Sequence, residues 1–132
     1  MSPLFKKLNL GQHVDIVVLN APASFEPELR LLADVRIGRD AASAEQIAFA
    51  LAFADTQTVV DALSPMLAAK ATDDAVLWFA YPKGTSKTLR CDFNRDNGWA
   101  VLKGLGFDTV RQVAIDADWS ALRFRRAQHI GR

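Results

Sequence analysis

The sequence predicts an α/β fold: a mostly parallel sheet with helices on both faces and a C-terminal antiparallel β-hairpin. Short apolar segments alternate with helical patterns, as in parallel strands joined by right-handed crossovers. Residues 14–20 are nearly all apolar and residues 75–81 are apolar throughout, which is typical of strands buried on both faces. Two extended segments flank the turn at 116–118, which indicates the hairpin. At 132 residues, half of them hydrophobic, we expect one domain spanning 1–132.

The first strand, at 14–20, is ended by Asn20-Ala21-Pro22. We expect Ser24 to cap a short helix that follows, with Pro27 near its first turn. Three leucines of this helix are expected to face inward: Leu29, Leu31 and Leu32.

The middle of the chain predicts two strands and a long helix. Residues 34–37 form a weak strand, and residues 45–54 alternate at period two, which favours a strand over a helix. Asp55 or Thr56 caps a helix that continues to about Lys70. Within that helix, Pro65 predicts a kink or a break.

The second half begins with the strongest strand, at 75–81, stopped by Pro82. We expect Trp78 or Phe79 to be buried against the helix at 57–70. A polar loop and a helix from about Asn94 to Gly104 follow, then strands at 107–115 and 119–125. Arg123, Arg125 and Arg126 are interpreted as strand-edge charges that improve solubility.

Composition excludes several classes of protein. The net charge of +1 argues against a strongly basic nucleic-acid binder, so nucleic acid is an unexpected partner. With one cysteine, Cys91, no internal disulfide can form, which suits a reducing compartment. One cysteine and two histidines nearly exclude a Cys/His zinc site, and no metal ligands are assigned. No apolar run is long enough for a signal peptide or a membrane span, so we expect a cytoplasmic protein without a membrane partner.

The candidate site is a polar loop after the central strand. It contains Lys83, Thr85, Ser86 and Lys87, and it follows a strand expected to run parallel to the one before Asn20 and Ser24. Ligands in open α/β sheets bind outside the carboxyl ends of strands, so both segments are expected to share a crevice. Lysines and hydroxyls there suit a phosphate or a carboxylate. The alternative is a solvated loop, and the spacing of a P-loop is absent.

No catalytic set emerges from the residues. Cys91 has no histidine near it in sequence and is interpreted as a plain thiol. Trp119, at the start of the hairpin's second strand, is interpreted as a packing residue, the alternative being a recognition platform.

Two resemblances concern the second half. Tyr81-Pro82-Lys83 and the ending Trp119-Ser120-Ala121-Leu122-Arg123-Phe124-Arg125 resemble a bacterial family of small soluble proteins of unknown function. The topology there is similar to the end of class I S-adenosylmethionine-dependent methyltransferases, which implies a reduced Rossmann or methyltransferase-like fold. Those enzymes bind their cofactor with a glycine-rich turn after the first strand, whereas here the turn at 19–24 contains no glycine.

These observations lead to two hypotheses about function. The first is a non-enzymatic binding module for a protein partner or a small anionic ligand. The alternative is a small enzyme on a reduced methyltransferase-like scaffold. No residue points to a particular cofactor, and the identity of the ligand is left open.

Overall fold

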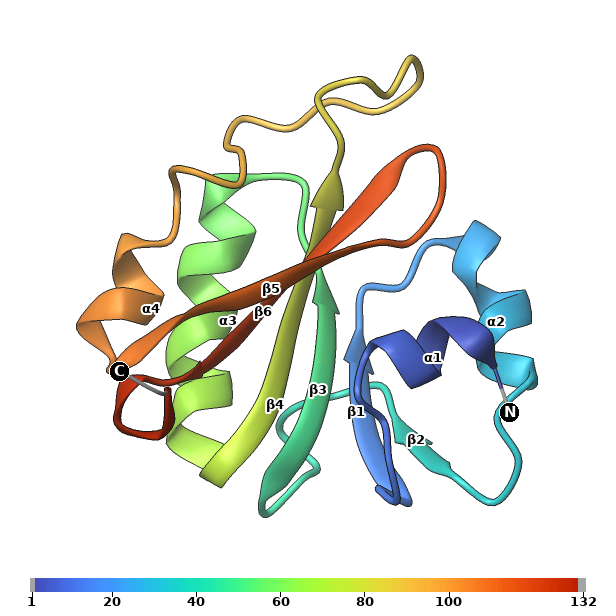
Figure 1. Ribbon diagram of the computed structural model, residues 1–132, viewed down its shortest axis with the longest axis vertical. Coiled ribbons are helices and arrows are strands. Elements are labelled where there is room, and N and C mark those ends of the chain that lie inside the picture. The colour runs from blue at the N-terminus through green and yellow to red at the C-terminus, as the bar shows by residue number, and fades with distance from the viewer. Residues whose placement is uncertain (1, 131–132) are drawn as a thin grey trace.

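The computed structural model describes residues 2–130 and is built on a six-stranded sheet in the order β2-β1-β3-β4-β6-β5 (Figure 1). The strands are β1 (Asp15–Leu19), β2 (Arg36–Gly38), β3 (Ile47–Phe53), β4 (Ala71–Pro82), β5 (Phe107–Ala114) and β6 (Trp119–Arg126). The first four run parallel, and β6 is antiparallel to both β4 and β5. The predicted fold class, with its parallel sheet and terminal hairpin, is confirmed.

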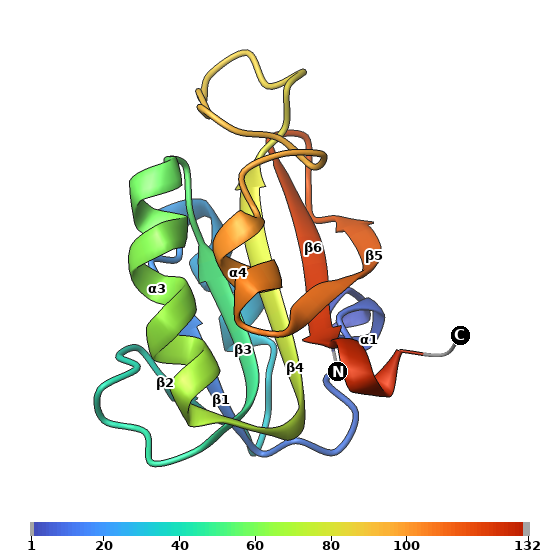
Figure 2. The same ribbon diagram turned by 90° about the vertical axis from the view of Figure 1, so that its left-hand side faces the viewer.

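Helices cover both faces of this sheet. They are α1 (Pro3–Lys7), α2 (Glu26–Arg30), α3 (Gln57–Lys70) and α4 (Ala100–Gly104), with short 3-10 turns η1 (Ala23–Phe25) and η2 (Ala127–His129). Figure 2 shows α3 and α4 on one side of the sheet and α1 on the other. Each face has its own hydrophobic cluster, so the sheet is buried from both sides. No helix within residues 2–130 is long and apolar enough to cross a membrane.

The central strand β4 is apolar on both faces. Trp78 and Phe79 are fully buried, and because successive residues of a strand point to opposite faces, they enter different clusters. Phe79 packs in the cluster that contains Leu67 of α3, as predicted. Trp78 lies on the other face, where its Nε1 donates a hydrogen bond to the Leu8 carbonyl at 2.8 Å.

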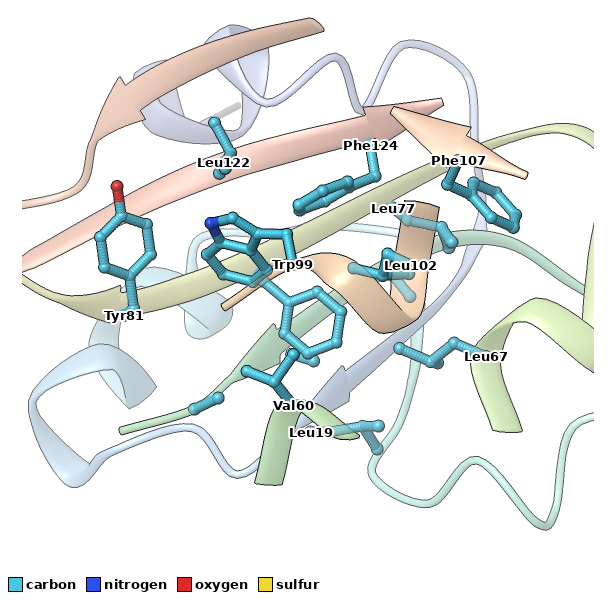
Figure 3. Close-up of a cluster of buried hydrophobic side chains, with 14 of the residues drawn as sticks. Leu19, Val60, Leu67, Leu77, Tyr81, Trp99, Leu102, Phe107, Leu122 and Phe124 are labelled. Atoms are coloured by element: carbon cyan, nitrogen blue, oxygen red, sulfur yellow. The ribbon is translucent and has the colours of Figure 1, made fainter. Parts of the chain in front are cut away.

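The helix α3 begins where the sequence predicts it. The Thr56 hydroxyl caps it by accepting a hydrogen bond from the Val59 amide at 3.3 Å. The helix continues through Pro65 to Lys70, so the predicted break does not occur. Figure 3 shows how Val60 and Leu67 of this helix meet Leu102 of α4 and the ring of Trp99 over the sheet.

Two predicted helix starts are wrong. Ser24 lies inside η1 and caps nothing, since α2 begins at Glu26 without a side-chain cap. Of the leucines expected to face inward there, Leu29 is buried but Leu31 is 55% exposed. Asn94 does not open a helix either. Its side-chain oxygen accepts the Asp96 amide at 2.8 Å and closes a turn, which is the local bonding that competes with helix formation.

The interpretation of the last arginines as strand-edge charges is also wrong. They belong to β6, which lies inside the sheet between β4 and β5, so β5 is the edge strand. Arg125 pairs with Asp74 at 2.7 Å. Arg123 is half-buried, its Nε has no hydrogen-bond partner, and burial lowers the pKa of its guanidinium.

Candidate functional site

The carboxyl ends of β1, β3 and β4 reach one edge of the sheet, beside the start of β6. A hollow of about 400 Å³ opens there, which we call the edge hollow. It is lined by Asn20, Pro22, Phe53, Ala54, Asp55, Val59 and Trp119. Its volume falls within the range of small-molecule sites, roughly 300–1,000 Å³.

The turn after β1 is shaped by Asn20. Its φ of +59° lies in the left-handed region, which asparagine tolerates better than most residues other than glycine. The side-chain amide of Asn20 donates to the Phe53 carbonyl at 3.4 Å and so joins the end of β1 to the end of β3. This contact holds two walls of the edge hollow in a fixed relation.

Aromatic rings form another wall of the edge hollow. The centroid of the Phe53 ring lies 5.1 Å from that of Trp119, in an edge-to-face arrangement, and 4.9 Å from that of Phe25. Asp55, which is exposed, lines the same hollow and directly precedes the Thr56 cap of α3. Aromatic residues and a carboxylate in the lining of one hollow suit a ligand that carries both a planar apolar ring and a positive charge.

A second hollow, of about 670 Å³, lies under the segment that follows β4; we call it the loop hollow. It is lined by Tyr81, Lys83, Gly84, Thr85, Asn94, Arg95, Asp96, Gln112, Ala114 and Ser120. Trp119 lines the edge hollow and Ser120, the next residue of β6, lines the loop hollow. The two hollows therefore flank the start of one strand.

The structure divides the sequence-predicted site residues. Asn20 lines the edge hollow, while Lys83 and Thr85 line the loop hollow. The two segments emerge at the same edge of the sheet, as expected, but β3 lies between their strands. Neither hollow includes Ser24 or Lys87. Anion binding by these residues stays a prediction.

Ser86 belongs to the support of the loop rather than to either hollow. It is 8% exposed, and its hydroxyl donates to the Asp118 carboxylate at 2.8 Å. The same oxygen accepts the Leu89 amide at 3.1 Å. These contacts join the loop to the turn between β5 and β6, so Ser86 determines the loop's shape.

The loop hollow is also lined by three residues that are not among the predicted site residues: Arg95, Gln112 and Ser120. They come from a loop and two strands, and no spacing in the sequence links them. The Cys91 thiol lies half-buried near this region, and burial raises its pKa. Across residues 2–130, no three His, Cys, Asp or Glu side chains lie close enough to hold a metal ion.

A larger hollow, of about 940 Å³, lies at the amino ends of β1 and β3. Its charges are partly satisfied internally, because Arg36 pairs with Asp15 through two hydrogen bonds of 2.6 and 3.0 Å. Ligands of open α/β sheets bind at the carboxyl ends of the strands, so we place the candidate site at the edge and loop hollows instead.

Comparison with protein-family models finds no match, and neither does comparison with curated proteins. The resemblance to a bacterial family of unknown function therefore has no support from them. Solved structures do match. A SAM dependent methyltransferase from Aquifex aeolicus superposes with a TM-score of 0.64 and 10% identity, over 93% of this chain and 87% of that chain.

Two further matches have similar values. N-methyltransferase NodS from Bradyrhizobium japonicum has a TM-score of 0.58 and 12% identity, over 92% of this chain and 91% of that one. Magnesium protoporphyrin IX methyltransferase from Synechocystis, with bound SAH, has a TM-score of 0.59 and 12% identity, over 94% and 78%.

These matches correct the leaning toward a non-enzymatic protein, because the three solved structures of similar fold named here are those of methyltransferases. At such low identity the likeness extends to the fold and not to the reaction. The chain therefore has a methyltransferase-like, Rossmann-type α/β fold.

Proposed function

We propose that this protein is a small enzyme whose edge hollow binds S-adenosylmethionine. The observation that carries the proposal is a hollow at the carboxyl edge of the parallel strands whose lining includes the exposed Asp55 together with Phe53 and Trp119. The fold likeness to S-adenosylmethionine-dependent methyltransferases supports the choice of ligand.

The residues of the edge hollow suit the chemistry of this ligand. S-Adenosylmethionine carries a planar adenine and two positive groups, a sulfonium and an ammonium. Trp119, which is 9% exposed and is backed by Phe53, offers aromatic surface to a ring or a cation, and the exposed Asp55 offers the opposite charge. The edge hollow differs from the cofactor site of class I methyltransferases in the turn after β1, because residues 19–24 contain no glycine.

Asn20 partly compensates for the missing glycine. Its left-handed backbone makes the sharp turn that a glycine would otherwise make. The β-carbons of Ala21 and Ala23 still restrict how closely a ligand approaches the backbone. Recognition is therefore assigned to the side chains of Asp55 and Trp119 rather than to the amides of the turn.

When bound, S-adenosylmethionine would supply a methyl group whose carbon a nucleophile attacks, with the neutral thioether as the leaving group. In this arrangement the carboxylate of Asp55 orients the cationic part of the ligand. The rings of Phe53 and Trp119 exclude water from its apolar part.

The proposal is tested by titrating S-adenosylmethionine and uncharged adenosine into the protein, with calorimetry as the readout. We expect Asp55→Asn to weaken S-adenosylmethionine binding about tenfold, as the loss of a charge-assisted contact does, and to leave adenosine binding nearly unchanged. Trp119→Leu weakens both ligands, because both carry the ring.

The matched control is Glu45→Gln, which removes an exposed carboxylate at the opposite end of the sheet. It is expected to bind S-adenosylmethionine like the wild type. The proposal fails if the wild type binds neither ligand, or if Asp55→Asn and Glu45→Gln have the same effect.

A further inference from the structure

A chain of hydrogen bonds crosses the loop hollow. The Arg95 guanidinium donates from Nη1 to the Gln112 Oε1 at 3.3 Å. Because a guanidinium only donates, this contact determines which end of the Gln112 amide is oxygen. The Gln112 Nε2 then donates to the Tyr81 hydroxyl at 3.0 Å and to the Ser120 hydroxyl at 2.9 Å.

These bonds leave the hydroxyls as donors. The amide uses both of its hydrogens on the oxygens of Tyr81 and Ser120, so each hydroxyl keeps its own hydrogen for another acceptor. Even when the two hydroxyls bond to each other, one hydrogen is left over. Burial raises the pKa of the Tyr81 phenol, which therefore stays protonated at neutral pH.

The two hydroxyls are held firmly in place. Tyr81 and Ser120 are each 4% exposed. The Tyr81 ring packs against Trp99 and Phe93, with ring centroids 5.8 Å away in both cases. Figure 3 shows the Tyr81 ring beside Trp99, with the phenol oxygen at the end of the ring farther from β4. The donors are thus built into the wall of the hollow and are not mobile surface groups.

Positive charge surrounds these donors. Lys83 and Arg95 both line the loop hollow, against one carboxylate, Asp96. Asp96 is mostly exposed and lies 3.5 Å from the guanidinium of Arg95, a separation at which surface ion pairs contribute little. Lys83 has no ion-pair partner within residues 2–130. Two cations and two hydroxyl donors suit an oxyanion, which presents only acceptors.

We infer that the loop hollow binds the oxyanion of a small-molecule substrate, a carboxylate or a phosphate. Its role as the substrate site rests on the proposed function, in which the edge hollow binds S-adenosylmethionine. The two hollows are neighbours, because Trp119 lines the edge hollow and Ser120, the next residue of β6, lines the loop hollow. Anion binding itself depends only on the groups that line the loop hollow.

The test is an NMR titration at low salt with inorganic phosphate and, separately, with acetate. The signals followed are the side-chain amide of Gln112 and the backbone amide of Ser120. The variant Lys83→Gln/Arg95→Gln removes two positive charges from the hollow. The control Lys87→Gln/Arg90→Gln removes the same charge from exposed positions of the same loop, outside the hollow.

We expect the first variant to weaken binding of the preferred anion at least about tenfold and the control less than about twofold. A third variant, Tyr81→Phe, keeps the ring and removes one donor, and we expect it to weaken binding severalfold. Whichever of phosphate and acetate binds more tightly identifies the oxyanion. Equal losses in the two double variants, or no binding of either anion to the wild type, overturn the inference.

Failure of this inference is distinguishable from failure of the proposed function. Anion binding that survives while S-adenosylmethionine does not bind removes only the proposed cofactor site. S-Adenosylmethionine binding with no response to either anion at Gln112 and Ser120 removes only the oxyanion site.

Discussion

Replacing Trp78 by phenylalanine tests how the N-terminal segment is held on the sheet. Trp78 is fully buried in β4, and its indole donates to the Leu8 carbonyl at 2.8 Å, directly after α1. Trp78→Phe leaves that carbonyl without its donor, which costs about 1–3 kcal/mol, and leaves a small cavity worth about 1 kcal/mol more. We therefore expect a loss of about 3 kcal/mol in the free energy of unfolding.

That loss corresponds to a fall in Tm of about 10 °C for a chain of this length, since unfolding entropy is about 2.1 cal/mol/K per residue. Calorimetry measures it directly. The control is Trp119→Phe, which makes the same change at an indole that is 9% exposed and makes no hydrogen bond within residues 2–130. We expect the control to lose about 1 kcal/mol. Equal losses in the two variants would refute the role assigned to the Leu8 hydrogen bond.

Three further predictions concern Gly98, the ion pair between Asp74 and Arg125, and the Cys91 thiol. Gly98→Ala is expected to lower the free energy of unfolding by more than about 1 kcal/mol, because Gly98 has a φ of +94° and a β-carbon there would lie 2.6 Å from the Gln57 amide oxygen; chemical denaturation measures this loss. The hydrogen bond from Arg125 holds the pKa of the Asp74 carboxyl below its ordinary value of 3.8, so the pair stabilises the fold above that pH and stops doing so as the pH falls through the lower folded-state pKa. We thus expect Asp74→Asn to be less stable than wild type at neutral pH and the difference, followed by urea denaturation, to shrink below about pH 4. Burial raises the pKa of the Cys91 thiol, so at about pH 7.5 we expect iodoacetamide to alkylate Cys91 more slowly than it alkylates free glutathione. Faster alkylation of Cys91 would contradict a raised pKa.

The parallel core of the fold could be predicted from the sequence because its signals are local. The apolar runs at 14–20 and 75–81 appear as β1 and β4, which are buried on both faces. Thr56 caps α3 because its hydroxyl reaches an amide only three residues further along the chain. Each of these features depends on neighbouring residues, so a single sequence is enough to reveal it.

The helix starts that failed were decided by competing local contacts. Asn94 has the residue type of an N-cap, but its side chain bonds the Asp96 amide and the chain turns before a helix can begin at Ala100. Residue preference alone does not distinguish a cap from a turn, since the same side-chain oxygen serves both.

The last arginines show a limit of a different kind. Their alternation with apolar residues is typical of an edge strand, yet β6 lies between β4 and β5. Chain order gives no indication of this position, because β6 is the last strand in sequence and an inner strand in space. Arg125 is accommodated by Asp74, which lies 51 residues earlier in the chain, and Arg123 is left with an unpaired Nε.

The loop hollow could not be predicted because it depends on an irregularity in β5. Strict alternation along this strand would place Gln112 on the face opposite Phe107. The register of β5 against β6 shifts by one residue between Thr109 and Arg111, and such a shift exchanges the two faces for every residue that follows. Phe107 therefore packs with the α3 side of the sheet, whereas Val113 packs with the α1 side, although the two are six positions apart and strict alternation would place them on one face. The same shift turns Gln112 toward Tyr81, where its amide bonds the phenol at 3.0 Å. The donor wall of the proposed oxyanion site thus depends on one extra residue in an edge strand, a feature that no pattern of hydrophobicity in the sequence reveals.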